Sequence, residues 1–142
     1  MVADVDLPQG YKPGPDEPYM SPLQLTYFRG KLLAWRADLM EEAEATLDNL
    51  RDDSHKDIGD EADRASRESD HTLELRTRDR YRKLLRKIDQ AMQRIEDGSY
   101  GYCEDTGEEI GLGRLEARPI ATLTVEAQER REFTERQTAS GL

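Results

Sequence analysis

The sequence has little of what a large buried core requires. Hydrophobic residues make up 35% of its 142 residues and aromatic residues 6%, and no apolar run approaches the length that spans a bilayer. Cys103 is the only cysteine, which excludes an internal disulfide. The N-terminus lacks the basic segment and apolar core of a signal peptide. We therefore expect a cytoplasmic protein with a thin core and no membrane association.

Charge is abundant and mostly negative. Charged residues make up 37% of the chain and the net charge is −10. This excess argues against direct DNA binding through a broad basic surface, because Lys and Arg contacts to phosphates dominate that affinity. Since both signs of charge alternate with regularly spaced leucines, the pattern indicates solvated helices rather than disorder. The composition favours a protein partner or a local cationic site.

A helix start is well marked after an N-terminal arm of residues 1–20. Ser21 is a candidate N-cap, Pro22 stands at the first helical position, Gln24 can close a capping box, and Met20 can pack on Leu25. Apolar residues then recur at spacings of three and four, which predicts one seam facing a partner helix. The seam comprises Leu25, Phe28, Leu32, Trp35 and Leu39, and continues more weakly through Ala43, Leu47 and Leu50.

A second helix is predicted over about residues 60–97, after the break at 51–63. Its apolar face comprises Leu73, Thr77, Tyr81, Leu84, Ile88, Ala91 and Ile95, and Gly98 is a candidate C-cap. The two helices would be roughly 46 Å and 57 Å long, too long for a compact bundle of this size. An antiparallel coiled-coil hairpin over residues 21–98, with its tip near 51–65, follows.

The sequence after Gly98 predicts a small globular domain over residues 99–123 and a C-terminal helix and tail over residues 124–142. "YGYC", "EDTG" and "EEI" suggest a short β-hairpin, Pro119 ends the brief segment after it, and Thr124 caps the last helix. The fold class is thus mainly α.

Cys103 stands where a zinc-binding knuckle would begin. Structural zinc takes four thiolate or imidazole ligands, typically as two C-x2-C pairs. The matching positions here hold Cys103, Thr106, Thr124 and Ala127, and His55 and His71 lie near the far end of the hairpin. We therefore expect no zinc. We favour a buried, hydrophobic Cys103 over a redox-active thiol.

Two charged stretches leave alternatives open. In Gly59–Asp70, the acids Asp60 and Asp63 suit the first turn of a helix, yet at the tip of a long stalk they can also reach a bound Mg²⁺ or a basic loop. The stretch Arg76–Lys87, with Arg114 and Arg118, is either a coiled-coil flank paired with acids on the first helix or an anion site.

Three stretches together resemble the DksA family of bacterial transcription regulators. They are "EPYMSPLQLTYFRGKLLAWR", "DEADRASRESDHTLELRTRDRYRKL" and "GYCEDTGEEIGLGRLEARP", and the resemblance runs from about Glu17 to Gln137. It implies a coiled-coil hairpin that carries a globular domain with a four-cysteine zinc finger, followed by a C-terminal helix.

The resemblance also implies a function. The protein would bind RNA polymerase as a monomer, insert the hairpin into the secondary channel, and alter promoter complexes without being an enzyme. With the alarmone guanosine tetraphosphate (ppGpp) it would repress ribosomal RNA promoters and activate some amino-acid biosynthetic promoters. The family's tip motif, D-x-x-D-R-A, is present as Asp60, Asp63, Arg64 and Ala65.

The family's ppGpp site and its zinc finger are both incomplete in this sequence. Two cationic positions of the ppGpp site match Lys87 and Arg118, but the third, a lysine, is replaced by Gln128. The finger has one cysteine of four, which indicates a zinc-independent variant. We expect Thr124 to cap the last helix, Thr106 to bond within its turn, and apolar residues to support the domain: Tyr100, Tyr102, Ile110, Leu112, Leu115 and Leu123.

Three alternatives fit the sequence less well than a DksA-type regulator. A Gre-type transcript-cleavage factor also has an acidic coiled-coil tip, but the tip motif and the globular domain have the DksA form. A structural coiled-coil protein would pair its seams between chains, whereas the short turn lets them pair within one chain. No nucleophile, base and oxyanion arrangement indicates an independent enzyme.

Overall fold

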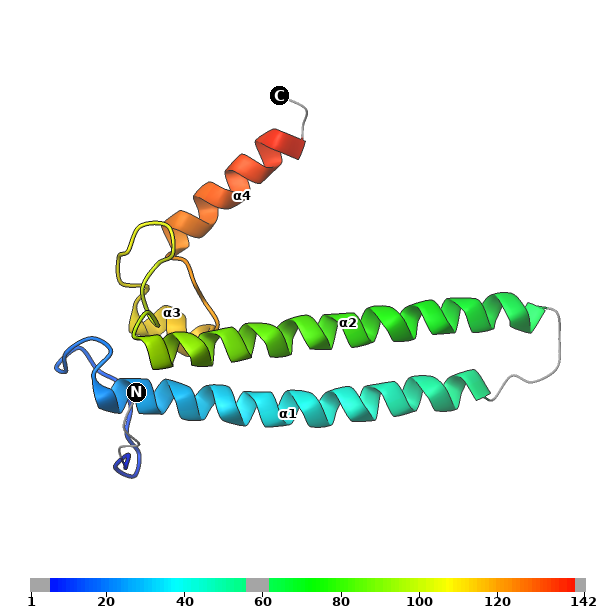
Figure 1. Cartoon of the computed structure of the whole chain (residues 1–142), viewed down its shortest axis with the longest axis horizontal. Helices are drawn as coiled ribbons and strands as arrows, with labels where there is room; N and C mark the ends of the chain where they lie inside the picture. The colour runs from blue at the N-terminus through cyan, green and yellow to red at the C-terminus, as the bar shows by residue number, and fades with distance from the viewer. Residues whose placement is uncertain (1–5, 56–61, 140–142) are drawn as a thin grey trace. The chain divides into compact units, whose positions relative to one another are not determined.

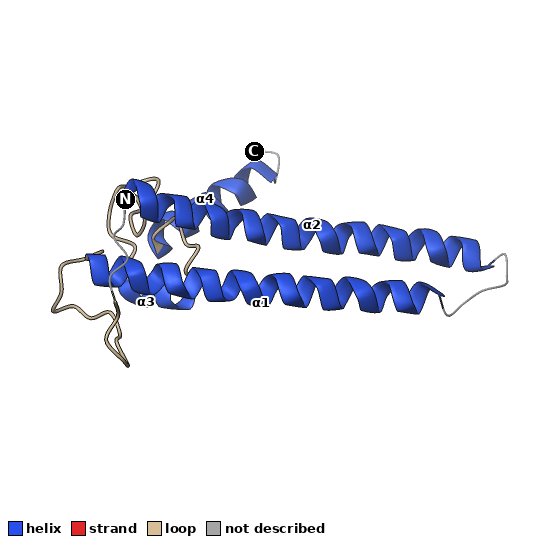
Figure 2. Cartoon of the chain, turned by 60° about the horizontal axis from the view of Figure 1, so that its bottom comes forward, coloured by secondary structure: helices blue, strands red, loops and turns tan. Residues whose placement is uncertain are grey.

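The computed structural model describes residues 6–55 and 62–139, and these residues form four helices. They are α1 (Pro22–His55), α2 (Ala62–Asp97), α3 (Leu112–Ala117) and α4 (Val125–Ala139) (Figure 1). In this part of the chain the expected β-hairpin is reduced to one antiparallel bridge between Tyr102 and Glu109, and Figure 2 shows helices joined by loops. The mainly α fold class is confirmed.

The chain divides into two compact units. The first, which we call the base unit, comprises Met1–Leu32 and Gln90–Leu142; the second, the hairpin unit, comprises Leu33–Asp89. Both α1 and α2 contribute residues to each unit. The base unit therefore contains the start of α1, the end of α2, and all of α3 and α4.

In the hairpin unit, α1 and α2 lie side by side and antiparallel (Figure 1). Their facing seams bury Leu39, Thr77, Tyr81 and Ile88. The hydroxyl of Tyr81 lies 3.2 Å from Thr46 Oγ1 and donates to Glu42 Oε1, also at 3.2 Å. Because these groups satisfy the phenol, a tyrosine is accommodated in an otherwise apolar seam.

The predicted seam is wrong at its distal end. Leu73 was expected to face α1, but its exposed fraction is 48%. The sequence of α1 beyond Leu50 has no apolar residue to cover it, and Arg51 pairs there with Glu74 of α2 (Nε–Oε1, 3.2 Å). The break expected from residue 51 is also wrong in part, because α1 continues to His55.

The base unit shows why α1 begins where it does. The backbone N–H of Gln24 donates to Ser21 Oγ at 3.3 Å, which confirms Ser21 as the cap. The side chain of Gln24 reaches one residue further back than a capping box requires: its Oε1 accepts from the N–H of Met20 at 2.7 Å, and its Nε2 donates to the carbonyl of Gly14 at 3.3 Å. Buried Gln24 thus joins the N-terminal arm to the helix.

The arm also contacts the loop that follows α2. Tyr19 donates its hydroxyl to the carbonyl of Gly101 at 2.7 Å and accepts the N–H of Gly111 at 2.9 Å. Gly101 has φ +90°, and a Cβ built there would lie 2.8 Å from Sδ of Met20. The backbone angle disfavours any side chain at this position, and a Cβ there would also require the Met20 side chain to shift.

Large buried side chains form the core of the base unit. Phe28, Leu32, Ile95, Tyr100 and Leu115 are almost fully buried. The ring centroids of Phe28 and Tyr100 are 5.8 Å apart, and the Tyr100 hydroxyl donates to the carbonyl of Pro119 at 2.8 Å. These contacts join α1, the loop after α2 and the segment after α3.

The end of α2 is capped as predicted. Gly98 has φ +84°, the left-handed conformation that glycine adopts at low cost. The N–H groups of Ser99 and Tyr100 both donate to the carbonyl of Arg94, at 3.0 and 3.1 Å. The chain can therefore leave the helix and enter the small loop that contains Cys103.

Candidate functional site

The loop around Cys103 is held by backbone hydrogen bonds. The Cys103 N–H donates to the carbonyl of Glu108 at 2.8 Å, and the Gly107 N–H donates to the carbonyl of Cys103 at 2.9 Å. The Glu104 N–H donates to the carbonyl of Thr122, also at 2.8 Å. These bonds give the finger-like turn a fixed shape and connect it to the residues just before α4.

The structure brings the predicted finger positions together. Thr124 donates its hydroxyl to Sγ of Cys103 at 3.9 Å and accepts the N–H of Ala127 at 3.2 Å, so it caps α4 as predicted. Thr106 Oγ1 accepts the N–H of Glu108 at 3.2 Å, one residue beyond the turn in which it was expected to bond. Cys103, Thr124 and Ala127 are all buried.

The environment of the Cys103 thiol acts on its pKa in two directions. Burial raises the pKa, whereas hydrogen bonds from the hydroxyl of Thr106 and from the backbone N–H groups of Thr124, Thr106 and Asp105 lower it. The hydrogen bonds prevail and bring the pKa to about 7. The sulfur is nevertheless enclosed, with an exposed fraction of 4%.

These four side chains do not fit a structural zinc ion. Such a site takes four thiolates or imidazoles, and here there are one thiol, two hydroxyls and a methyl group. The Thr124 hydroxyl donates a hydrogen bond to the Cys103 sulfur and accepts one from the N–H of Ala127, so it already has a partner as donor and as acceptor. In residues 6–55 and 62–139, no cluster of three or more His, Cys, Asp or Glu residues is placed to hold a metal ion.

An ion pair that the sequence analysis missed connects the finger-like turn to α4. Arg131 Nε donates to Oδ2 of Asp105 at 2.9 Å, and Arg131 Nη2 donates to Oδ1 of the same carboxylate. Glu104 Oε2 lies 3.8 Å from Arg131 Nη2. The bidentate bond from Arg131 lowers the pKa of Asp105. Arg131 follows Ala127 by four residues and Thr124 by seven, so helical spacing was the available signal for this contact.

Not all of the expected apolar supports are buried. Ile110, Leu115 and Leu123 are buried together with Tyr100, and Leu112 is half-buried. Tyr102 is the exception, with an exposed fraction of 38%; its ring meets Tyr19 edge-on at 5.6 Å between centroids. Tyr102 lies at the β-bridge to Glu109, where successive residues point to opposite faces. Because its neighbours Gly101 and Cys103 are buried, the side chain of Tyr102 points toward solvent.

The tip motif is only partly described. Asp60 lies outside the described residues. Asp63 falls in the first turn of α2, and its side chain is outside the described set. Arg64 and Ala65 follow in the same turn and are exposed. Three residues of the motif, Asp63, Arg64 and Ala65, therefore lie in the first turn of α2.

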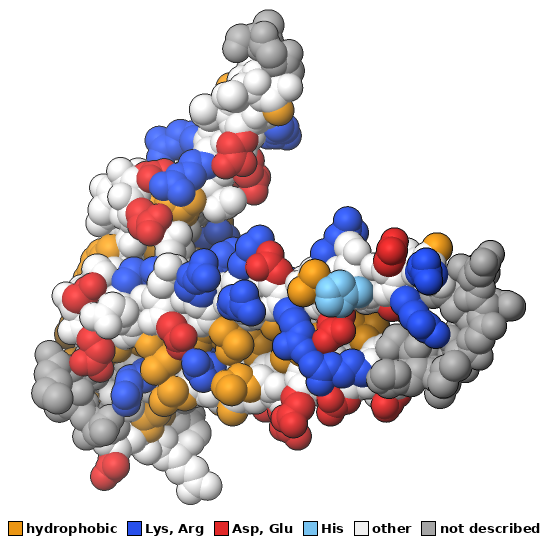
Figure 3. Space-filling view, turned by 45° about the vertical axis from the view of Figure 1, so that its right-hand side comes forward, with side chains coloured by type: hydrophobic (Ala, Val, Ile, Leu, Met, Phe, Trp, Pro, Cys, Tyr) orange, Lys and Arg blue, Asp and Glu red, His pale blue; other side chains and the backbone are white. Residues whose placement is uncertain are grey.

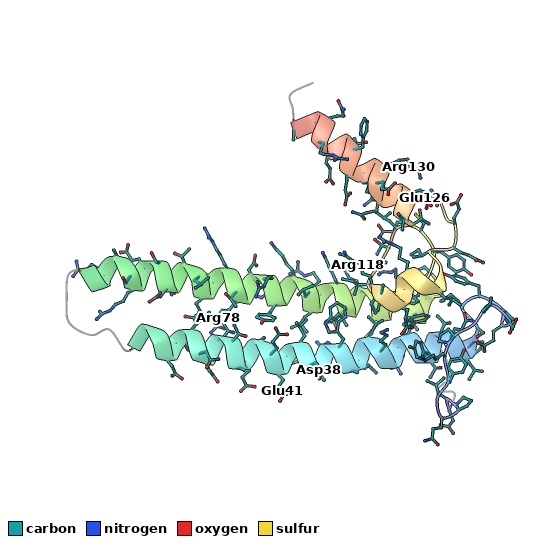
Figure 4. The ribbon with its side chains drawn as sticks, turned by 180° about the vertical axis from the view of Figure 1, so that it is seen from behind. Asp38, Glu41, Arg78, Arg118, Glu126 and Arg130 are labelled. Carbon is teal, nitrogen blue, oxygen red and sulfur yellow. The ribbon has the colours of Figure 1, made fainter. Side chains whose placement is uncertain are left out.

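The three positions of the expected ppGpp site are divided between the two units. Lys87 is exposed on α2 in the hairpin unit. Arg118 is exposed at the end of α3, and Gln128 is half-buried on α4, both in the base unit. The Nε2 of Gln128 donates to Oε1 of Glu132 at 3.0 Å. Gln128 is thus neutral and already bonded to a carboxylate. Figure 4 shows Arg118 near the end of α3 and Arg130 on α4.

The basic residues of Arg76–Lys87 were expected, as one alternative, to pair with acidic residues of α1, and the cross-helix ion pairs run in the opposite direction. The cross-helix ion pairs Arg36–Asp89 (Nε–Oδ1, 2.8 Å) and Arg51–Glu74 join an arginine of α1 to an acid of α2, the reverse of the expected direction. Arg78 pairs within its own helix, with Glu74 at 3.0 Å. Figure 4 shows Arg78 on the side of α2 toward α1, whereas Asp38 and Glu41 lie on the far side of α1.

Comparison with known proteins identifies the family. Residues 24–95 match the family model described as DnaK suppressor protein DksA, N-terminal domain, and residues 98–133 match the prokaryotic dksA/traR C4-type zinc finger. The matched segments cover the hairpin and the finger-like region in the order seen in the fold. This chain belongs to the DksA family.

Particular relatives agree with this assignment. The chain is 60% identical over 128 residues to the RNA polymerase-binding transcription factor DksA of Caulobacter vibrioides, covering 89% of this chain and 88% of that protein. It is 43% identical over 129 residues to the protein of the same name from Escherichia coli, covering 91% and 85%. A solved structure, transcription factor DksA2 from Pseudomonas aeruginosa, is 48% identical, has a TM-score of 0.74, and covers 86% of this chain and 93% of its own.

The long helices of residues 6–55 and 62–139, α1 and α2, are highly charged. None of the helices in this part of the chain combines the length and the apolar character needed to cross a bilayer.

Proposed function

We propose that this protein binds RNA polymerase and regulates transcription by inserting its hairpin into the secondary channel, without catalysing a reaction. One observation carries the proposal: the tip motif Asp60, Asp63, Arg64 and Ala65 is complete in a chain whose residues 24–95 match the DksA N-terminal family model. Its relatives are named RNA polymerase-binding transcription factors. A long antiparallel helix pair with the motif at the start of α2 suits delivery of carboxylates into a narrow passage.

The tip is the part of this proposal that acts on promoter complexes. Asp60 and Asp63 would approach the polymerase active centre, where carboxylates can interact with basic residues or with a bound Mg²⁺. Ribosomal RNA promoters would be repressed and some amino-acid biosynthetic promoters activated.

Guanosine tetraphosphate is the proposed effector. Lys87 and Arg118 are exposed cations suited to its phosphates, Arg through bidentate hydrogen bonds and Lys as a point charge. Gln128 supplies no charge at the third position, so the response to the alarmone is weaker than with three cations.

Folding without zinc is also proposed. The Thr124–Cys103 hydrogen bond and the Asp105–Arg131 ion pair join the finger-like turn to α4, as a shared metal ion would, and the Thr106 bond and the Thr124 cap support the turn and the helix start locally. These interactions are formed by protein groups alone, so the finger-like turn and the start of α4 would keep their structure without a metal ion.

In vitro transcription from a ribosomal RNA promoter tests the proposal. Purified polymerase would be combined with the wild-type protein, with Asp63→Asn, and with Asp70→Asn, a matched change at an exposed acid outside the motif. Repression by the wild type and by Asp70→Asn, deepened by the alarmone and lost in Asp63→Asn without loss of polymerase binding, supports a functional tip. Equal behaviour of the three proteins would refute it, and cleavage of backtracked transcripts would indicate a Gre-type factor instead.

A further inference from the structure

A second apolar stripe runs along α1 in the hairpin unit. Leu33, Met40 and Leu47 are seven residues apart, so they lie on one side of the helix. Leu33 and Met40 have exposed fractions of 42% and 51%, and Leu47 is half-buried. The stripe lies beside the inner seam that buries Leu39 against α2. A heptad stripe that its own hairpin leaves uncovered is typical of a helix that packs against one more helix.

The same face continues onto α2. A groove of about 440 Å³ beside the contact between the two helices is lined by Leu47, Tyr81 and Leu85 and by arginines of α2 that include Arg82. Figure 3 shows basic side chains along the hairpin beside a band of hydrophobic side chains, with acidic groups at the margin. We call this surface the open face. Its residues used below are Leu33, Met40, Glu44 and Leu47 of α1 and Arg82 and Leu85 of α2.

Two ion pairs define which residues of α1 and α2 lie at the same level of the hairpin. Arg36 pairs with Asp89 at 2.8 Å, and Arg51 pairs with Glu74 at 3.2 Å. The fifteen residues from Arg36 to Arg51 are matched by fifteen residues from Asp89 back to Glu74. The register of the two helices is therefore constant between the pairs.

Counted from the Arg36–Asp89 pair, apolar and charged residues of the open face stand level with one another. Met40 of α1 and Leu85 of α2 each lie four residues from that pair, so they share a level. Glu44 lies eight residues from the pair and Arg82 seven. Both are exposed, and none of the ion pairs of the described residues involves either of them.

A two-fold axis parallel to the hairpin makes the open face complementary to itself. Turning a second copy about such an axis leaves every level unchanged and places α2 of that copy opposite α1 of the first. Met40 then meets Leu85 of the second copy, and Glu44 meets Arg82 of the second copy. Each contact occurs twice, because a two-fold interface uses the same surface on both copies.

Charge disfavours the other two-fold arrangement of the same faces. An axis perpendicular to the hairpin would place α2 opposite α2. The arginines that line the groove, Arg78, Arg82 and Arg86, would then face the same row in the other copy. Like charges opposed across an interface suppress such a pairing. The net charge of −10 disfavours nucleic acid as the group that covers this face.

We propose that a second copy of this chain covers the open face, giving a two-fold symmetric dimer of hairpins whose tips lie at the same end. This inference goes beyond the proposed function and concerns the free protein. The dimer covers the apolar stripe of each copy and gives Glu44 and Arg82 their partners. Insertion of a single hairpin into the polymerase would require the two copies to separate, so self-association would limit the amount of active protein.

The first test is sedimentation velocity of the full-length protein at increasing concentration. The wild type is expected to form a dimer that dissociates on dilution and on addition of salt. Glu44→Arg opposes arginines across the two-fold interface, and Arg82→Glu opposes glutamates. Each variant should therefore raise the dissociation constant by about tenfold or more.

Mixing the two variants separates charge pairing from other effects. In a mixed dimer, every arginine at these positions of one copy meets a glutamate of the other, so an equal mixture of Glu44→Arg and Arg82→Glu should dimerise as the wild type does. Asp38→Arg and Lys83→Glu are the controls. Figure 4 shows Asp38 on the far side of α1, and Lys83 does not line the groove, so these variants should dimerise like the wild type. Helix content by circular dichroism verifies that all variants fold.

A second test determines which helices meet. The photoreactive residue p-benzoylphenylalanine would replace Met40, which is exposed in a single chain. After irradiation, the crosslinked dimer is isolated on a denaturing gel and the joined segments are identified by mass spectrometry. We expect crosslinks to the part of α2 around Leu85.

Several results would overturn the dimer. They are a wild-type protein that remains a monomer at every concentration, single variants that dimerise as the wild type does, and a mixture of variants that stays monomeric. Crosslinks from position 40 to α1 alone would overturn the arrangement with the tips together. None of these measurements uses polymerase, so the transcription assay with Asp63→Asn decides the proposed function separately.

Discussion

Thr124 joins Cys103 to the first turn of α4: its hydroxyl donates to the cysteine sulfur at 3.9 Å and accepts the N–H of Ala127 at 3.2 Å. Cys103 and Thr124 are two of the four positions that the sequence analysis matched to the cysteines of the family's finger. One side chain therefore performs locally, by hydrogen bonding, the connection that a shared metal ion would make between the turn and the helix.

Replacing Thr124 with alanine tests this connection. The change removes the cap of α4 and should lower the free energy of unfolding by about 1 kcal/mol, within the usual range for lost caps. Thr124→Ser keeps the hydroxyl and should remain close to the wild type. Urea denaturation of the three proteins measures the difference, and equal stability of the alanine and serine variants would count against a capping role.

Metal chelation should leave the protein unchanged. Because the positions Cys103, Thr106, Thr124 and Ala127 offer one thiol, the melting temperature is expected to be the same with and without a chelator. The triple variant Thr106→Cys, Thr124→Cys, Ala127→Cys should bind zinc stoichiometrically and lose stability on chelation. A drop in the wild-type melting temperature on chelation would contradict zinc independence.

Local signals in the sequence were sufficient for much of the fold. The start of α1 followed from Ser21 and Pro22 and the end of α2 from Gly98, because capping depends on neighbouring residues alone. Heptad spacing also identified Phe28, Leu32 and Ile88 as buried. These predictions needed no knowledge of distant contacts.

Predictions that depended on a partner surface succeeded less well. Leu73 fits the periodicity of α2 but is exposed, because the facing part of α1 is polar. Tyr102 was expected in the core, but its place at the β-bridge directs it outward. The Arg131–Asp105 contact was missed, since spacing within α4 places Arg131 on the side of Thr124 and Ala127 but does not reveal which loop residue its side chain will meet.

The Asp105–Arg131 ion pair should stabilise the base unit in a pH-dependent way. The pKa of Asp105 is lowered by Arg131, so its contribution is present above the ordinary value of 3.8 and is lost as the pH falls through the lower, folded-state value. The melting-temperature difference between wild type and Asp105→Asn should therefore be largest near neutral pH and shrink on acidification.

A double-mutant cycle with Arg131→Gln isolates the pair. If the two side chains interact, the double variant should lose less stability than the two single losses added together, and added salt should reduce the difference from wild type. Single effects that simply add would show that the two residues act independently.

Tyr100→Phe should destabilise the core of the base unit. The phenol donates to the carbonyl of Pro119 at 2.8 Å in a buried environment, and removing it leaves that carbonyl without this donor. The expected cost is about 1 to 3 kcal/mol. Tyr102→Phe is the matched control, because this tyrosine is partly exposed, and it should have little effect. Equal effects of the two substitutions in urea denaturation would contradict the assigned hydrogen bond.

Gln128→Lys should strengthen the response to guanosine tetraphosphate, provided that the alarmone binds as proposed. A charge-assisted hydrogen bond to a phosphate contributes about 1.5 to 3 kcal/mol, so the concentration giving half-maximal repression should fall by roughly tenfold or more. Thr138→Lys adds the same charge to an exposed position of α4 ten residues away and should leave that concentration unchanged. Titration of the alarmone in the transcription assay separates the two variants. A site-specific gain for Gln128→Lys alone would mean that this residue limits the response, whereas equal gains would attribute the effect to general charge.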